Sequence, residues 1–237
     1  MKITSAARPA IIAVTGLAKE ARIAAGPGVR AIAGGGNARR LADLLERELA
    51  LGARAVISFG IAGGLVDDVA SGTWLVARTI VTPNARWRCD EAWTQALVEC
   101  LPESTAVDLA GVDAPVMDAA SKHGLHRATG AAAVDTESHI AAAIAASYGL
   151  PFAAFRVVAD TARRTLPPVA AVALNRNARI SGRAVLGSLA RKPGQWPLVL
   201  HTAVDARRAL RALLRGRRRL GPGLAYPDLG ELLLDVS

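Results

Sequence analysis

The sequence predicts an α/β protein, a three-layer α/β/α sandwich built on a central mixed, mainly parallel sheet. Short apolar runs with the length of buried strands alternate with segments of helical periodicity, an order typical of parallel sheets with crossover helices. Hydrophobic residues make up 51% of the chain and aromatic residues only 4%, so small aliphatic side chains must build the core. Glycine-rich segments follow two of the expected strands, where such sheets usually bind ligands.

Each expected strand is a short, mostly apolar run that ends at glycine or a polar residue. The run at 53–60 is continuously apolar and predicts a buried strand, whereas the run at 30–34 is weaker. The last strand is bounded by Pro151 and delivers Asp160 at its carboxyl end. In order along the chain, the expected strands are 10–15, 30–34, 53–60, 73–81, 108–112, 131–135 and 151–160.

The expected helices are segments whose apolar residues recur at helical spacing. Gly149 is placed to end the helix that separates the last two strands. The turn after the first strand carries Glu20 towards the sheet edge. The other helices follow in order at 38–51, 87–101, 118–127, 140–148, 172–190 and 198–215.

One domain over residues 1–237 is preferred, because no internal repeat or low-complexity linker divides the chain. The net charge of +9 is unevenly distributed. Between Arg176 and Arg219 there are twelve Lys or Arg residues and a single acid, so the remainder carries a net charge of −2. Residues 172–219 therefore form a basic helical C-terminal region on an otherwise ordinary domain.

Composition also narrows the class of protein. No long apolar segment precedes the first strand, and no run of about 18 uncharged apolar residues occurs, so a cytoplasmic protein without a membrane span is expected. Cys89 and Cys100 form neither a ligand cluster nor a disulfide framework. No metal site and no cofactor are expected.

The most informative stretch combines Val134-Asp-Thr-Glu-Ser-His-Ile140 with the strand that ends at Asp160. A strand, a helix and a second strand place Glu137 and Asp160 at the same edge of a parallel sheet. An acid at a strand end can also be a helix cap or a surface charge.

These motifs resemble those of the nucleoside phosphorylase/nucleosidase superfamily. The resemblance runs from about Ile11 to Pro168 and includes Gly60-Ile-Ala-Gly-Gly-Leu65 and the early Gly-Leu-x-x-Glu20. The nearest classical pattern is that of methylthioadenosine/S-adenosylhomocysteine nucleosidase. Thr129-Gly130-Ala131, Glu137-Ser138-His139 and Leu166-Pro167-Pro168 are most similar to the hopanoid-associated branch, which is linked to adenine removal from adenosylhopane.

The resemblance implies a nucleoside phosphorylase-like fold and a role for each acid. Asp160 would protonate the departing purine, and Glu20 would orient the attacking water. Glu137 would bind the ribose hydroxyls. The resemblance further assigns substrate contacts to the following residues: Thr136, Phe152, Gly60, Ile61, Ala62 and Gly63.

Three departures leave the nucleophile open. Many relatives carry Ser where this chain has Ile61, Met where it has Thr136, and an aromatic residue near the small Ala120. The lost hydroxyl favours hydrolysis over phosphorolysis, although Arg22 or Arg39 could supply a site for inorganic phosphate as co-substrate.

The sequence therefore predicts an enzyme that releases adenine from an adenosylhopane-like lipid nucleoside in hopanoid biosynthesis, as a homo-oligomer. One alternative is a nucleosidase for soluble methylthioadenosine or S-adenosylhomocysteine. The other is a non-catalytic module that binds nucleic acid or membrane. The basic region predicts contact with an anionic membrane at the inner face, and nucleic acid ranks lower because no aromatic residues are interleaved. The arginines expected on one helix face are Arg207, Arg208, Arg211 and Arg215, and the apolar residues expected on the opposite side are Val199, Ala203, Leu210, Leu213 and Leu214.

Overall fold

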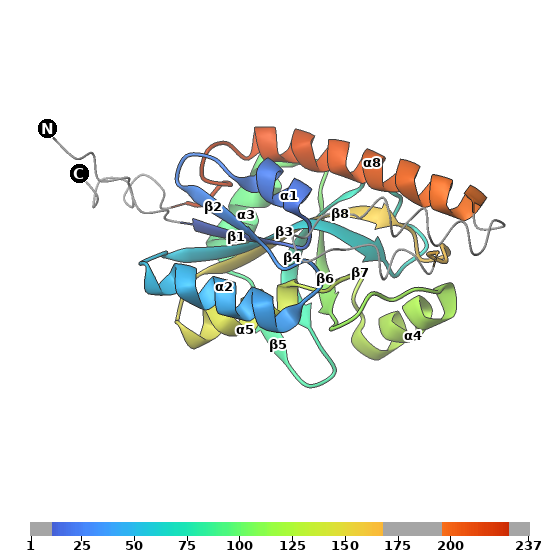
Figure 1. Ribbon diagram of the computed structural model, residues 1–237, viewed down its shortest axis with the longest axis horizontal. Helices are drawn as coiled ribbons and strands as arrows, with labels where there is room; N and C mark the ends of the chain where they lie inside the picture. Colours follow the sequence, from blue (N-terminus) through green and yellow to red (C-terminus); the bar gives the residue numbers. More distant parts are fainter. Residues whose placement is uncertain (1–10, 168–195, 228–237) are drawn as a thin grey trace, which may run out of the picture.

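The computed structural model describes residues 11–167 and 196–227. Within these ranges an eight-stranded sheet carries helices on both faces (Figure 1). Its strands are β1 (Ile11–Thr15), β2 (Val29–Ala33), β3 (Ala55–Gly64), β4 (Trp74–Val81), β5 (Arg86–Arg88), β6 (Thr105–Gly111), β7 (Ala133–Asp135) and β8 (Phe152–Asp160). The helices are α1 (Ala18–Ala24), α2 (Ala38–Ala50), α3 (Glu91–Cys100), α4 (Ala119–Thr129), α5 (Ser138–Ser147) and α8 (Trp196–Arg219).

Alternation along β1 explains the layers. Successive strand side chains point to opposite faces. Ile11 and Ala13 therefore enter one core, which α1, α3 and α8 cover, while Ile12 and Val14 enter the other, which α2 and α5 cover. Figure 1 shows α1 and α8 above the sheet and α2 and α5 below it. The predicted α/β/α sandwich is confirmed.

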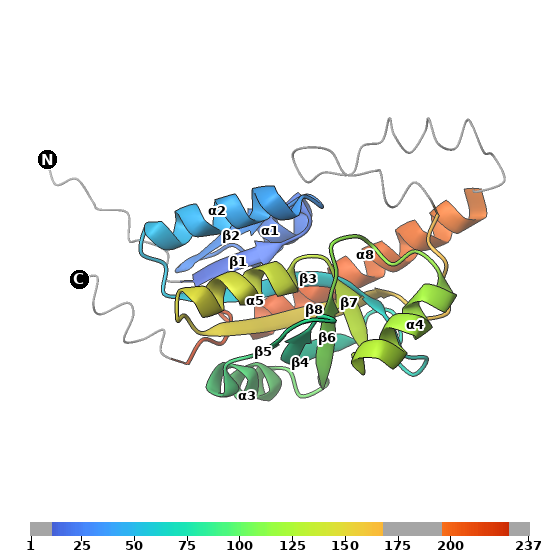
Figure 2. The same ribbon diagram turned by 90° about the horizontal axis from the view of Figure 1, so that it is seen from below.

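The sheet is mixed and mainly parallel, as predicted, since five of its eight strand pairings are parallel. Beyond that prediction, it closes partly on itself. β8 pairs with β3 in parallel and with β4 antiparallel, so β3, β7, β6, β4 and β8 form a ring. The ring brings the carboxyl ends of β3, β7 and β8 close together, and Figure 2 shows α4 at this end of the molecule.

Two expected elements differ from those observed. The glycine-rich segment 60–65 is mostly strand, because Gly63 and Gly64 pair with β7 and extend β3 beyond its predicted end. The segment 87–101 is not one helix: β5 pairs with β4, and α3 begins only where the Asp90 side chain accepts a hydrogen bond from the N–H of Trp93 at 2.8 Å.

The helix α8 packs closely on β8 through small residues. Ala209, Ala212 and Leu213 are buried there, and a Cβ added at Gly216 would lie 2.7 Å from Cζ of Phe155. The Trp74 indole donates a hydrogen bond to the carbonyl of Ala212 at 2.9 Å. The sequence correctly predicts a helix here with its arginines outward. It wrongly predicts that Ala203 and Leu214 face inward, because the small residues bring a different stripe to the sheet.

The first basic helix, expected at 172–190, lies outside the described residues. The single domain over residues 1–237 stays a prediction for the same reason. In the part of the chain that the structure describes, no helix is long and apolar enough to cross a membrane.

Candidate active site

A cavity of about 200 Å³ opens where β3, β7 and β8 end. Its walls come from the turn between β1 and α1, from the segments 61–63 and 134–137, and from the end of β8. The remaining wall is apolar, with Val112, Pro115, Val116 and Leu166. The ring of strands therefore builds a pocket that joins carboxylates to an apolar surface.

Glu20 is buried in the first turn of α1, with 1% of its surface exposed. Its two carboxylate oxygens accept hydrogen bonds from backbone N–H groups: Oε2 from Leu17 at 2.7 Å and Oε1 from Ile61 at 2.8 Å. Burial raises the pKa of Glu20 from 4.5 to about 7, although the Arg156 guanidinium opposes the shift. A carboxyl group with a pKa near neutrality is suited to general base catalysis at pH 7.

Glu137 stands beside a buried ion-pair network. Arg156 is fully buried in β8, with Nε 3.0 Å from Oδ2 of Asp135 and Nη2 3.5 Å from Oε2 of Glu137. Asp135 also accepts hydrogen bonds from the N–H groups of Glu137 at 2.9 Å and Ser138 at 2.7 Å, which fixes the start of α5. The Thr136 hydroxyl donates to Oε1 of Glu137. Burial raises the pKa of Glu137, and Arg156 opposes that shift.

Gly60 leaves room for Glu20 and for Arg156, the ion-pair partner of Glu137. A Cβ at this position would lie 2.6 Å from Nη1 of Arg156 and 2.8 Å from Oε1 of Glu20. Such distances are far below van der Waals contact, so only glycine fits without displacing a charged group. Gly60 thus lies against Arg156 and Glu20 and does not itself line the cavity.

Asp160 ends β8 and lines the cavity. Its Oδ2 accepts a hydrogen bond from Nζ of Lys122, which is fully buried on α4. Burial raises the pKa of Asp160, and the Lys122 ammonium opposes the shift.

Sequence reasoning missed Lys122. Its place beside the buried Thr129 on the inward face of α4 is visible only in the structure. A lysine on the inward face of a short helix needs a buried partner.

The structure brings together most of the predicted site residues. Those that line the cavity are Glu20, Ile61, Ala62, Gly63, Thr136, Glu137 and Asp160. Phe152 does not lie at the cavity, which corrects its predicted role as a substrate contact. It begins β8, about 26 Å from Asp160 at ~3.3 Å per residue, and borders a different recess beside Trp87 and Cys89.

Arg22 and Arg39, considered for phosphate, are exposed and do not line the cavity. Among the described residues, no group of three or more His, Cys, Asp or Glu side chains is placed to hold a metal ion.

Comparison with known proteins decides the family. The family model described as the phosphorylase superfamily matches residues 6–189. The chain belongs to the phosphorylase superfamily. No curated protein sequence matches it.

The solved structures that resemble this chain share little sequence identity with it. The Helicobacter pylori futalosine hydrolase is 15% identical, with a TM-score of 0.63 over 89% of this chain and 96% of that protein. The methylthioadenosine/S-adenosylhomocysteine nucleosidase of the same organism is 13% identical, with a TM-score of 0.63 over 96% and 99%. The S-adenosylhomocysteine nucleosidase of Streptococcus pyogenes is 14% identical, with a TM-score of 0.58 over 90% and 97%. These likenesses support the nucleoside phosphorylase-like fold.

Proposed function

We propose that this superfamily member hydrolyses the N-glycosidic bond of a purine nucleoside. The observation that carries the proposal is the meeting of Glu20, Glu137 and Asp160 in one cavity, each with a different set of partners. Two buried acids, Glu20 and Glu137, beside a third whose side chain is only 13% exposed are costly to fold unless they serve a purpose. Their separate environments suit separate tasks.

The proposed reaction divides the work among the three acids. Asp160 gives its proton to N7 of the base as the glycosidic bond breaks, and the bonding electron pair leaves with the base. Glu137 accepts hydrogen bonds from the ribose hydroxyls and favours the positive charge that develops on the sugar. Glu20 takes a proton from the water that adds to the sugar carbon. General acid or base catalysis of this kind contributes about 10²–10⁴-fold each.

The charge of the cavity favours water over phosphate as the nucleophile. Its described lining contains four carboxylates, from Glu20, Asp135, Glu137 and Asp160, and no Arg, Lys or His side chain. The nearby Arg156 is already paired with Asp135 and Glu137. A phosphate dianion would meet net negative charge and no cation in the described lining.

The apolar wall supports a substrate with an apolar 5′ group. Val112, Pro115, Val116 and Leu166 present no group that would bind the charged amino-acid tail of S-adenosylhomocysteine. We therefore favour an adenosylhopane-like lipid nucleoside of hopanoid biosynthesis. Methylthioadenosine, whose 5′ group is small and apolar, is the alternative, and a homo-oligomer remains a prediction.

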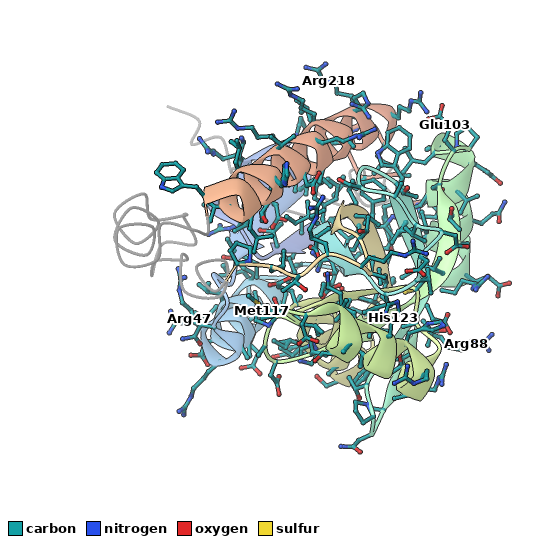
Figure 3. All side chains as sticks on the ribbon, turned by 90° about the vertical axis from the view of Figure 1, so that its right-hand side faces the viewer. Arg47, Arg88, Glu103, Met117, His123 and Arg218 are labelled. Atoms are coloured by element: carbon teal, nitrogen blue, oxygen red, sulfur yellow. The ribbon has the colours of Figure 1, made fainter. Side chains whose placement is uncertain are left out.

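The outer face of α8 supports a membrane contact in the cytoplasm. Trp196, Leu200 and Val204 are 55%, 62% and 54% exposed. Their spacing of four residues keeps them within about one quarter of a turn of one another. The basic residues of the same outward arc are also exposed: Arg207, Arg208, Arg211 and Arg215. Figure 3 shows Arg218 at the outer surface of the same helix. Apolar and cationic side chains on one arc suit the interface of an anionic bilayer.

The test of the reaction is adenine release from methylthioadenosine, adenosine and an adenosylated hopanoid, each with and without phosphate. Release that is independent of phosphate, and that Asp160→Asn lowers by about 10²–10⁴-fold, is expected. No release from any of the three nucleosides by the wild-type protein would contradict the proposed activity. Release that requires phosphate would overturn hydrolysis.

Cosedimentation with lipid vesicles tests the membrane contact. Vesicles that contain phosphatidylglycerol should bind the protein, and replacing the four arginines by glutamine should weaken binding by about 1 kcal/mol per residue. Binding that is indifferent to anionic lipid would rule out this surface. Tighter binding to duplex DNA than to the vesicles would favour the nucleic-acid alternative instead.

A further inference from the structure

Lys122 is the one buried cation in contact with an acid of the cavity apart from Arg156, among the residues described. Its ammonium donates to Oδ2 of Asp160, to the carbonyl of Thr161 at 2.9 Å and to the carbonyl of Arg164 at 2.8 Å. An ammonium has three N–H donors, so these acceptors satisfy all of them. Lys122 therefore stays in place as a charged group, and Asp160 is its only anionic partner in this set.

Resting on the proposed hydrolysis, we propose that Lys122 is a positioning residue that holds Asp160 and stabilises the carboxylate formed when Asp160 protonates the base. The proton moves from the Asp160 carboxyl to the base nitrogen while the glycosidic bond breaks. Negative charge then appears on Asp160 beside the ammonium. Because this attraction is greater after proton transfer than before, it lowers the barrier as well as fixing the side chain.

Among the described residues, Asp160 shares the cavity with the acids Glu20, Asp135 and Glu137, and two charged groups act on it from outside the cavity lining. Lys122 approaches from α4 and favours the carboxylate, whereas Asp205 approaches from α8 and disfavours it. Asp205 is itself paired with Arg164 at 3.2 Å. On β3 the neighbour is Gly63, which carries no charge.

Two further basic side chains nearby, Arg163 and His123, contact Asp67. Arg163 pairs with Asp67 at 2.8 Å, and His123, the residue after Lys122 on α4, lies 3.4 Å from the same carboxylate. Lys122 is thus the direct cationic partner of Asp160 among the described residues.

The critical variant is Lys122→Gln, which keeps two N–H donors for the carbonyls of the loop and removes the charge. Asp205→Asn is the matched control, because it loosens the same loop through Arg164 but removes a negative charge. If Lys122 acts through its charge, the two variants shift the titration midpoint of Asp160 in opposite directions. If it acts only by holding the loop, they shift that midpoint in the same direction.

Two readouts follow Asp160. One is the basic limb of the pH profile of kcat for adenine release, since Asp160 acts in its protonated form. The other is an NMR titration of its carboxyl carbon in the substrate-free protein, assigned by loss of the signal in Asp160→Asn. In Lys122→Gln both midpoints should move up by about one pH unit, and the maximal kcat should fall about tenfold because the acid is weaker. In Asp205→Asn both should move down.

The outcomes separate the two proposals. Absence of adenine release from the wild-type protein defeats the proposed function before any variant is compared. An active wild type whose limb and titration stay unchanged in Lys122→Gln defeats only the role of Lys122. Equal shifts of the same sign in both variants also defeat it. If Lys122→Gln does not fold, Lys122→Met, which is uncharged and of similar length, takes its place, and the absence of an upward shift in that variant overturns the proposal.

Discussion

Glu20 is the residue whose surroundings say most about the chemistry of the cavity. Two backbone N–H groups fix its oxygens, while burial raises its pKa to about 7, close to the pH at which it would act. A base that is too weak binds no proton, and one that is too strong is already protonated. This carboxylate lies between those limits.

Replacing Glu20 by glutamine should lower kcat for adenine release by about 10²–10⁴-fold, because the amide cannot accept a proton from water. In the wild type, kcat/KM should rise with pH through a midpoint near 7, as Glu20 loses its proton in the free enzyme. Steady-state kinetics between pH 5 and pH 9 check both points. A wild-type profile that is flat across this range would contradict the assignment of Glu20 as the base.

At the residue scale, the sequence predicts the acids but not their partners. Glu20, Glu137 and Asp160 stand in motifs with a local pattern. Lys122 and Arg156 become important only through pairs with residues 38 and 21 positions away. Such pairs depend on tertiary structure, which no local pattern encodes. Phe152 lies far from the cavity because the whole length of β8 separates it from Asp160, and a motif alone does not give that length.

At the scale of elements, α8 packs closely on the sheet because one of its positions has no side chain. Gly216 lets the ring of Phe155 approach the helix backbone, and Trp74 reaches the carbonyl of Ala212 from the same side. On the opposite side of α8 lie the exposed arginines. The sequence predicts the arginine face correctly and the buried Leu213, but it does not predict the burial of Ala209, Ala212 and Gly216, because Leu at a helical position suggests burial more strongly than Gly or Ala does.

Gly216→Ala should therefore destabilise the protein by about 1–3 kcal/mol, as overpacking does, although alanine favours helix formation. The matched control is Gly124→Ala in α4, where a Cβ would meet nothing closer than 3.9 Å. That change should stabilise by about 0.5–1 kcal/mol. Urea unfolding of the three proteins measures the difference. Equal effects of the two substitutions would show that α8 is not packed as described.

At the scale of the whole molecule, the sequence predicts the layers and the mixed sheet, since both follow from strand alternation and from the order of elements. It does not predict the ring of strands. That ring depends on β8 pairing both with β3 and with β4, which a list of strands in order cannot reveal. The cavity exists because of the ring. The sequence therefore predicts which acids belong to the site, but it does not predict that they lie close together.

Stability should depend on pH in a way set by these acids. The pKa of Glu20 is about 7 in the folded protein and near 4.5 when unfolded, so folding favours its neutral form. Its contribution is fully present below pH 4.5 and is lost as pH rises through 7, by about 3 kcal/mol in total. The raised pKa values of Glu137 and Asp160 act in the same direction.

Free energies of unfolding in urea at pH 5 and pH 8 check this expectation, with Glu20→Gln as the comparison. The wild type should lose stability between the two pH values, and the variant should lose less, whatever its stability at pH 5. An equal loss in both proteins would show that Glu20 does not titrate with folding.

The hydrogen bond from the Ile61 N–H to Glu20 bears on which substitutions the cavity can accept. The backbone N–H of Ile61 donates a hydrogen bond to Glu20, while the Ile61 side chain lines the cavity. A residue with any side chain offers the same N–H, provided it is not proline. Under the proposed function, position 61 can therefore be varied to reshape the pocket for a new nucleoside while the hydrogen bond to Glu20 is kept, which makes it a natural starting point for directed evolution of specificity.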